Sequence, residues 1–395
     1  MSKNIRIKIL TFIRYLGDSF FYPFLAIYLK SLTFGETRIG ILIAATPLIA
    51  IIVNPIYSKI CKNAQVLKIV LGTISLLEGI GIVLLSLVTN YYVILGIIIF
   101  VAITGTSHYG LLDSLSTIYS EYHHINFSNI RVYGSVAYAI GTTISGIVIE
   151  NLGYTFSFGI CMVLFLISSI MYYTLGKVST KEDDVKVDRS YREVFTNKGF
   201  ILYFFFYFLL YGTMKTNQNF YGLLIEHRGL SSGDFGLIYT SFVFVEVVTL
   251  IILDKFDKKI KYNIIAFSIA LQTVILFFVN GSDLPVTVLL IVGLLRGTAY
   301  AMILHINYKI LVRLVGVRNA TIAILLLELS INIFVIIGNG VGGVILEFMS
   351  YKAFYWILAG IQAFAMIFYL IFVRKYIKEI DNTRALELSE VQSEE

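Results

Sequence analysis

The sequence predicts an all-α membrane protein with 12 transmembrane helices arranged as two pseudo-symmetric six-helix bundles. The composition is the first observation: 57% of the residues are hydrophobic and 14% are charged, whereas soluble proteins carry about 25% charged residues. Apolar runs also recur from end to end, and about 20 apolar residues are enough for a helix to cross a hydrocarbon core of about 30 Å. An internal repeat is the third observation and divides the chain into two halves.

Short polar turns separate most of the apolar segments. The exception is a long polar connection over 177–198, which we interpret as a cytoplasmic linker between a bundle over 1–176 and a bundle over 199–378. The tail over 379–395 is polar and acidic, and we predict that it is disordered. The predicted helices are 5–30, 39–61, 66–88, 91–122, 127–150, 154–176, 199–226, 233–255, 261–280, 284–312, 318–347 and 351–376.

The first apolar segment is expected to be a membrane helix and not a cleaved signal peptide. Arg14 and Asp18 interrupt its apolar region, and no small-residue cleavage site follows. Cys61 and Cys161 fall at a helix end and inside a helix, a placement that predicts neither a disulfide nor a metal framework.

The distribution of Lys and Arg predicts the orientation in the membrane. With these spans, 23 of the 31 Lys and Arg residues lie on the side that holds both termini, and four lie on the other. Cytoplasmic loops carry the excess of positive charge, so both termini are expected in the cytoplasm of a multi-pass cell-membrane protein. The remaining four cations lie inside predicted helices: Arg14, Arg131, Lys215 and Arg296.

Two sequence echoes indicate that the halves are homologous. FLAIYLKSLTFGETRIGIL, from Phe24, aligns without a gap with FYGLLIEHRGLSSGDFGLI, from Phe220. GIVIENLGYTF, from Gly146, pairs with GVILEFMSYKAF, from Gly343. Parallel repeats of this kind are typical of transporters that bind substrate near the bilayer midplane, between the halves.

Asp113 and Arg131 are the strongest candidates for solute binding. They lie at similar distances on either side of the turn near His123, so their depths differ by only about 4 Å at about 1.5 Å per helical residue. Tyr138 follows seven residues after Arg131, on the same helical face. A charge in the bilayer costs at least about 2.5–3.5 kcal/mol on insertion scales and usually faces a cavity or a partner. The alternative is a purely structural salt bridge between the two helices.

Other polar residues inside the predicted helices are further candidates. Asp18 lies four residues after Arg14, so these two either contribute to binding and coupling or neutralise each other. In the predicted seventh helix, amides beside Lys215 are expected to line the substrate path, with interhelical hydrogen bonding as the alternative. These amides are Asn217, Gln218 and Asn219.

Isolated carboxylates in the predicted eighth and eleventh helices are candidates for proton coupling. Glu246 and Glu328 could load and release a proton by alternating between a dry and a cation-lined environment, with Lys215 and Arg296 as possible cations. For each carboxylate the alternative is a fixed ion pair. His108 is a candidate charge partner or a satisfied core histidine, and Glu78 receives no role.

The arrangement resembles the major facilitator superfamily along almost the whole chain. YPFLAIYL, from Tyr22, and the segment from Asp113 to Tyr138 are similar to the cluster of lactose permease, phenylpropionate permease and nucleoside–proton symporters. The resemblance implies that Asp113 and Arg131 hold sugar hydroxyls while Tyr138 stacks on the ring, with Asp in place of Glu and Tyr in place of Trp. Glu246 resembles an acidic position of the same cluster.

Two departures limit what the resemblance implies. The signature between the second and third helices is degraded to NPIYSKICKNAQ, without its usual glycine and aspartate. The predicted tenth helix reads LLRGTAYAMILH, with Arg296 and no carboxylate, where lactose permease carries a His and a Glu for proton translocation. The coupling groups of that protein therefore cannot be transferred to this chain.

We therefore expect a secondary transporter that imports a small polar solute, such as a sugar, glycoside or nucleoside, together with protons. A proton-driven exporter of drugs or metabolites is the alternative, although the fifth helix lacks the GP-rich signature of such antiporters. A solute receptor without transport is a third possibility. The sequence has no phosphate-binding glycine loop, HExxH or nucleophile elbow, so we expect no enzyme. The expected partners are a small-molecule substrate and the lipid bilayer; we expect a monomer with no cofactor, metal or nucleic acid.

Overall fold

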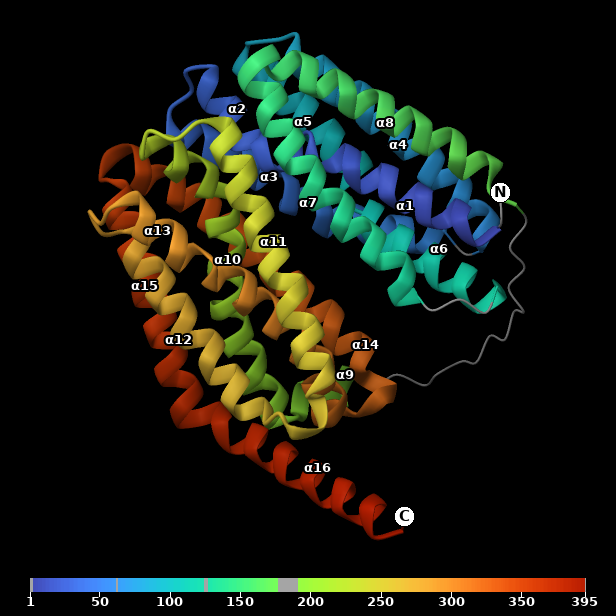
Figure 1. The fold of residues 1–395 in the computed structure, drawn as a ribbon, viewed down its shortest axis with the longest axis vertical. Helices are drawn as coiled ribbons and strands as arrows, with labels where there is room; N and C mark the ends of the chain where they lie inside the picture. Colours follow the sequence, from blue (N-terminus) through green and yellow to red (C-terminus); the bar gives the residue numbers. More distant parts are fainter. Residues whose placement is uncertain (1–2, 62, 124–126, 177–190, 395) are drawn as a thin grey trace. The chain divides into compact units, whose positions relative to one another are not determined.

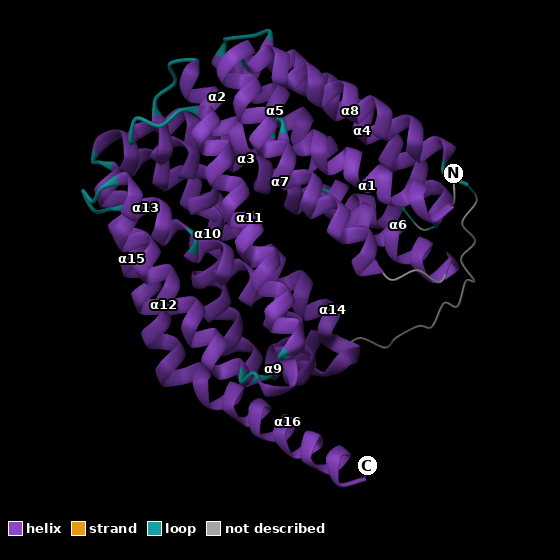
Figure 2. Ribbon diagram, viewed as in Figure 1, coloured by secondary structure: helices purple, strands orange, loops and turns teal. Residues whose placement is uncertain are grey.

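The described part of the structure consists of helices joined by loops and turns, as Figure 2 shows. The structure is a computed structural model that describes residues 3–61, 63–123, 127–176 and 191–394. No strand occurs among these residues. The first set of helices is α1 (Lys3–Ser19), η1 (Tyr22–Phe24), α2 (Leu25–Ser31), α3 (Glu36–Ile60), α4 (Ala64–Ser86), α5 (Tyr91–Gly105), α6 (His108–His123), α7 (Phe127–Leu152) and α8 (Tyr154–Thr174).

The second set of helices begins near the end of the predicted linker over 177–198. Its first member, the short helix α9, lies inside that linker, whose residues 177–190 fall outside the described part. The set consists of α9 (Tyr191–Thr196), α10 (Lys198–His227), α11 (Ser232–Lys255), η2 (Asp257–Lys259), α12 (Tyr262–Asn280), α13 (Val286–Gly293), α14 (Leu295–Phe348), α15 (Tyr351–Phe368), the π-helical turn η3 (Tyr369–Val373) and α16 (Arg374–Glu394).

The predicted class, an all-α membrane protein, is confirmed. In the described part, ten stretches are long and apolar enough to cross a membrane. One of them, over 286–348, has 63 residues, or about 95 Å of helix at about 1.5 Å per residue, which is far more than one crossing needs. Gly316 interrupts it with φ 78° and ψ 158°, a backbone conformation that suits glycine. The prediction divides this stretch at the same place, after residue 312.

The first membrane segment, predicted as one helix over 5–30, is interrupted near Pro23. α1 ends at Ser19, η1 contains Pro23, and α2 resumes the helix at Leu25. Proline removes a backbone donor and favours such breaks. The predicted fourth helix is also interrupted, because α5 ends at Gly105 and α6 begins at His108.

The chain divides into two compact units, which we describe separately. Unit 1 comprises residues 1–184, 219–240 and 339–343, and unit 2 comprises residues 185–218, 241–338 and 344–395. Unit 1 therefore contains the first sequence half together with two pieces of the second, and unit 2 contains the rest of the second half. Within unit 1, the backbones of α7 and α11 approach each other closely at Gly146 and Gly236, where an added Cβ would meet backbone atoms.

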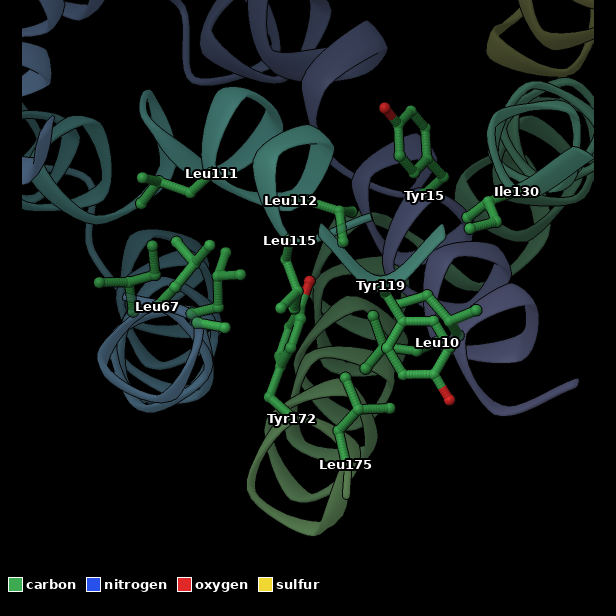
Figure 3. Close-up of a cluster of buried hydrophobic side chains, with 14 of the residues drawn as sticks. Leu10, Tyr15, Leu67, Leu111, Leu112, Leu115, Tyr119, Ile130, Tyr172 and Leu175 are labelled. Atoms are coloured by element: carbon green, nitrogen blue, oxygen red, sulfur yellow. The ribbon is translucent and has the colours of Figure 1, made fainter. Parts of the chain in front are cut away.

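The core of unit 1 lies between α1, α4, α6, α7 and α8, which lie side by side in Figure 1. Figure 3 shows how side chains from these helices meet, with Tyr172 of α8 reaching Leu115 of α6. Buried apolar side chains dominate the cluster, and each large one contributes about 1.5–3 kcal/mol on burial. This packing fixes the helices that carry the candidate site.

In unit 2, α16 is helical where the sequence predicts a disordered tail from Glu379. The difference has a local cause, because α16 contacts the segment that leads into α12. Asp381 accepts hydrogen bonds from the backbone N–H groups of Tyr262 and Asn263, at 2.8 and 3.0 Å. Arg384 donates to the carbonyl of Ile260 at 3.0 Å and to Asp257 Oδ2 at 2.7 Å.

Asp257 is the centre of this contact, in the turn between α11 and α12. Its Oδ1 lies 2.7 Å from His305 Nε2 and 2.7 Å from Lys309 Nζ. Partial burial alone would raise the pKa of Asp257, but hydrogen bonds from Lys309 and His305 outweigh it and hold the pKa below its ordinary value. A lowered carboxyl pKa stabilises the fold above the unfolded value of about 4, and this contribution is lost as the pH falls.

We predict that Asp381→Ala destabilises unit 2. The substitution removes the acceptor for the first N–H groups of α12, a capping role usually worth about 0.5–2 kcal/mol. Thermal unfolding of the purified protein measures the loss, and Asn382→Ala, at an exposed neighbouring position, is the matched control. Equal melting temperatures for the two variants would contradict the assigned role of Asp381.

Candidate functional site

The sequence-predicted pair Asp113 and Arg131 is in direct contact in unit 1. Arg131 Nη1, from α7, donates to Oδ1 and Oδ2 of Asp113, from α6, at 2.5 and 2.7 Å. The two side chains nevertheless keep 43% and 38% of their surface exposed. Further donors of the guanidinium and lone pairs of the carboxylate can therefore serve a ligand.

The ring of Tyr15 of α1 packs against the guanidinium of Arg131. The guanidinium carbon of Arg131 lies 5.4 Å from the centre of the Tyr15 ring, within the range of a cation–π contact. Gly134, one turn after Arg131, allows this approach, because a Cβ there would lie 2.9 Å from the Tyr15 ring. A glycine at position 134 therefore allows α7 to contact α1 closely at Tyr15.

Tyr138 completes the predicted set on α7. Its ring centre lies 6.0 Å from that of Tyr239, at the end of the 219–240 segment of unit 1. The side chain is half-buried beside the unit 1 core. Arg131 and Tyr138 thus lie on one face of α7, and Asp113 of α6 is bound to Arg131. This arrangement can hydrogen-bond hydroxyl groups and pack against a ring.

Arg14 and Asp18 belong to a different, fully buried network in unit 1. Arg14 Nη2 lies 3.0 Å from Asp18 Oδ1 and 2.8 Å from Glu78 Oε2, and all three side chains are 0% exposed. The Tyr22 hydroxyl donates to Glu78 Oε1 at 2.5 Å. The sequence placed Arg14 and Asp18 on one face but gave no role to Glu78. The one available signal was its position inside the apolar run of α4.

His108 is a buried core residue of α6 whose two ring nitrogens differ. Its Nε2 lies 3.0 Å from the hydroxyl of Tyr172, whereas its buried Nδ1 has no hydrogen-bond partner among the described residues. His108 is also a neighbour of the Arg14 network, which acts on it electrostatically.

In unit 2, Lys215 of α10 faces a pair of tyrosines. Its Nζ donates to the Tyr300 hydroxyl of α14 at 2.8 Å and to Gln218 Oε1 at 3.4 Å. The Tyr211 hydroxyl donates to the same Tyr300 oxygen at 2.7 Å. The predicted amides belong to different units. Asn217 is buried in unit 2, whereas Asn219 lies in unit 1 and donates a hydrogen bond to Asn339 at 3.1 Å.

The predicted coupling carboxylates of unit 2 lie near the tyrosines of α10. Glu246 acts electrostatically on Tyr211, and Glu328 on Tyr207. Glu246 is half-buried and Glu328 is exposed. The guanidinium of Arg296 lies 5.3 Å from the Phe242 ring and is 9% exposed. The structure thus places Lys215 beside Tyr300 and Arg296 beside Phe242.

The described residues contain no group of three or more His, Cys, Asp or Glu side chains that could hold a metal ion. Cys61 and Cys161 are free thiols. The chemistry that the described side chains offer is hydrogen bonding, charge pairing and proton exchange.

Comparison with protein families matches most of the chain. A family model described as "MFS_1 like family" matches residues 4–357.

The curated relatives are remote. The chain is 23% identical to "Uncharacterized transporter YwbF" of Bacillus subtilis (strain 168) over 259 residues, 64% of each chain. It is 21% identical to "Maltose permease" of Geobacillus stearothermophilus over 227 residues, 55% of this chain and 56% of that one. These alignments span less than two thirds of the relatives' own length.

Among solved structures, the nucleoside transporter NupG is similar in fold. The TM-score is 0.78 with 14% sequence identity, covering 94% of this chain and 98% of NupG. At this identity the likeness shows the fold alone. The matched family and the relatives carry transporter names and are not enzymes.

We predict that the Asp113–Arg131 pair contributes little to stability. An exposed ion pair is worth at most about 1 kcal/mol, whereas breaking a buried pair costs about 3–5 kcal/mol. A double-mutant cycle with Asp113→Asn and Arg131→Gln, read out by thermal unfolding, measures the coupling. The cycle with Arg14→Gln and Glu78→Gln is the buried comparison. Equal coupling energies would mean that Asp113–Arg131 is a structural clasp and not a ligand site.

Proposed function

The chain belongs to the MFS_1 like family, part of the major facilitator superfamily, and on that premise we propose that it is a secondary transporter for a small polar organic solute. The substrate class we propose is a sugar, glycoside or nucleoside. Transport proceeds by alternating access, in the direction of uptake. The protein acts as a monomer in the cell membrane, with both termini in the cytoplasm.

The observation that carries this proposal is the exposed Asp113–Arg131 pair with Tyr138 on the same face of α7. Arg131 offers a planar set of donors and Asp113 offers acceptors, so together they can hold adjacent hydroxyl groups that both donate and accept. Tyr138 supplies a flat apolar surface for a sugar or base ring. A ribose or pyranose ring presents both features at once.

The names of the remote relatives support the same substrate class. One curated relative is named a maltose permease, and the structural neighbour is named a nucleoside transporter. Both solutes carry a ring with several hydroxyl groups. In unit 2, Asn217, Gln218 and Arg296 are further candidate contacts for such a solute, because their polar groups lie inside membrane-spanning helices.

The proposed driving force is the proton gradient. Membrane-embedded carboxylates are the usual groups for carrying a coupled proton. Glu246 and Glu328 in unit 2 and Asp18 in unit 1 are the candidates. Efflux of drugs would call for a wide apolar surface, whereas the side chains at the candidate site of unit 1 are polar and aromatic.

We predict that Arg131→Lys abolishes uptake while the protein stays folded in the membrane. Lysine keeps the charge but loses the planar set of donors, and each lost charge-assisted hydrogen bond costs about 1.5–3 kcal/mol. The measurement is uptake of radiolabelled maltose and uridine into proteoliposomes with an imposed inward proton gradient. Arg318→Lys is the control, since Arg318 is an exposed residue paired with Glu193. Wild-type uptake by Arg131→Lys would contradict the assigned site.

A further inference from the structure

Three ionisable side chains meet in the interior of unit 1 without balancing their charges. Arg14 Nη2 lies between Asp18 Oδ1, at 3.0 Å, and Glu78 Oε2, at 2.8 Å. All three side chains are 0% exposed. One guanidinium therefore faces two carboxylates, and all three groups are buried. If both carboxylates are ionised, the network carries a net charge of −1.

The surroundings do not supply a second cation. Within the described residues, Arg14 is the cation that acts on both Asp18 and Glu78. The other titratable groups that act on the network are phenols and a thiol, which are neutral in their ordinary form, and the imidazole of His108, which bonds to the Tyr172 hydroxyl. They are Tyr15 of α1, Tyr22 of η1, Tyr57 of α3, His108 and Tyr109 of α6, and Cys161 and Tyr172 of α8.

An unbalanced buried charge costs several kcal/mol. The state with one proton on a carboxyl group has the lower free energy, because this proton makes the network neutral. Two carboxylates around one arginine therefore favour the binding of one proton. The proton resides on the carboxyl group whose negative charge receives fewer hydrogen bonds.

The hydrogen bonds identify which carboxyl group this is. Glu78 accepts from Arg14 on Oε2 and from the Tyr22 hydroxyl on Oε1, so both of its oxygens are stabilised as a carboxylate. Asp18 Oδ1 pairs with Arg14 Nη2 at 3.0 Å, but neither oxygen of Asp18 accepts a hydrogen bond of normal geometry from the described residues. The Tyr109 hydroxyl of α6 is a further donor to Asp18 that does not reach that geometry. Of the two carboxyl groups, Asp18 therefore has the weaker support for a negative charge.

We propose that Asp18, held between Arg14 and Tyr109 beside the Arg14–Glu78 pair, binds the proton that the transporter couples to solute. This inference rests on the proposed function and narrows its coupling site to unit 1. Glu78 is a positioning residue, since it holds Arg14 and Tyr22 without carrying the proton itself.

The position of Asp18 places proton binding beside a break in the first membrane segment. Asp18 lies in the last turn of α1, and its carbonyl accepts the Phe21 N–H at 3.2 Å, directly before the break that leads into η1. When the O–H bond of Asp18 breaks and the proton passes to water, the new carboxylate competes with Glu78 for Arg14 Nη2. Tyr22, which holds Glu78, lies on the other side of the same break. Proton release therefore changes the ionic contacts on both sides of this break.

The first test detects the protonated carboxyl group directly and needs no solute. Infrared spectroscopy of the purified protein detects the carbonyl stretch of a protonated carboxyl group during an alkaline titration. We expect Asp18→Asn to remove one such band and Glu78→Gln to shift its titration, with thermal unfolding as the check on folding. A band that persists in folded Asp18→Asn, or that disappears instead in Glu246→Gln or Glu328→Gln, would overturn the proposal.

The second test separates coupling from transport. Proteoliposomes are assayed with maltose and uridine for exchange without a gradient and for accumulation driven by a proton gradient. We expect the ratio of driven accumulation to exchange to collapse in Asp18→Asn and to be restored in Asp18→Glu. A wild-type ratio in Asp18→Asn would overturn the coupling role while the transport function stands. Absence of any solute movement by the wild type would instead contradict the transport function, while the infrared result would still decide the proton site.

Discussion

The contact between Arg131 and Asp113 is the constraint on which the candidate site depends. It joins α6 to α7 and holds opposite charges together in unit 1. The ring of Tyr15 packs against the guanidinium, and Gly134 leaves the space for it. The pair is fixed by two hydrogen bonds and yet partly exposed. These are the two properties that a binding site for a polar solute requires.

The charges of unit 1 divide into two groups by exposure. The Asp113–Arg131 pair is balanced and open to a ligand, whereas the Arg14 network is closed and has one carboxylate too many. A balanced open pair favours recognition of neutral hydroxyl compounds. An unbalanced closed network favours exchange of a proton. Tyr15 and Tyr109 connect the two groups, since their rings lie 5.1 Å apart.

The sequence predicts those features that depend on local geometry. The rise of a helix is enough to predict that Asp113 and Arg131 lie at similar depths. Glu78 could not be assigned, because its partner Arg14 lies 64 residues away on another helix. The helical tail was missed for the same reason: Asp381 and Arg384 look like solvated charges until α12 supplies their partners. The sequence indicates that a charged side chain lies in an apolar segment, but it does not show which helix supplies the partner of that charge.

The central claim is that Asp113, Arg131 and Tyr138 bind a hydroxylated ring. The most direct measurement is the thermal stability of the purified protein with maltose, uridine and a panel of related sugars and nucleosides. Our account predicts that one of these classes raises the melting temperature of the wild type, and that the increase vanishes in Asp113→Asn although this variant is folded. Stabilisation of wild type and Asp113→Asn by the same solute to the same extent would contradict it.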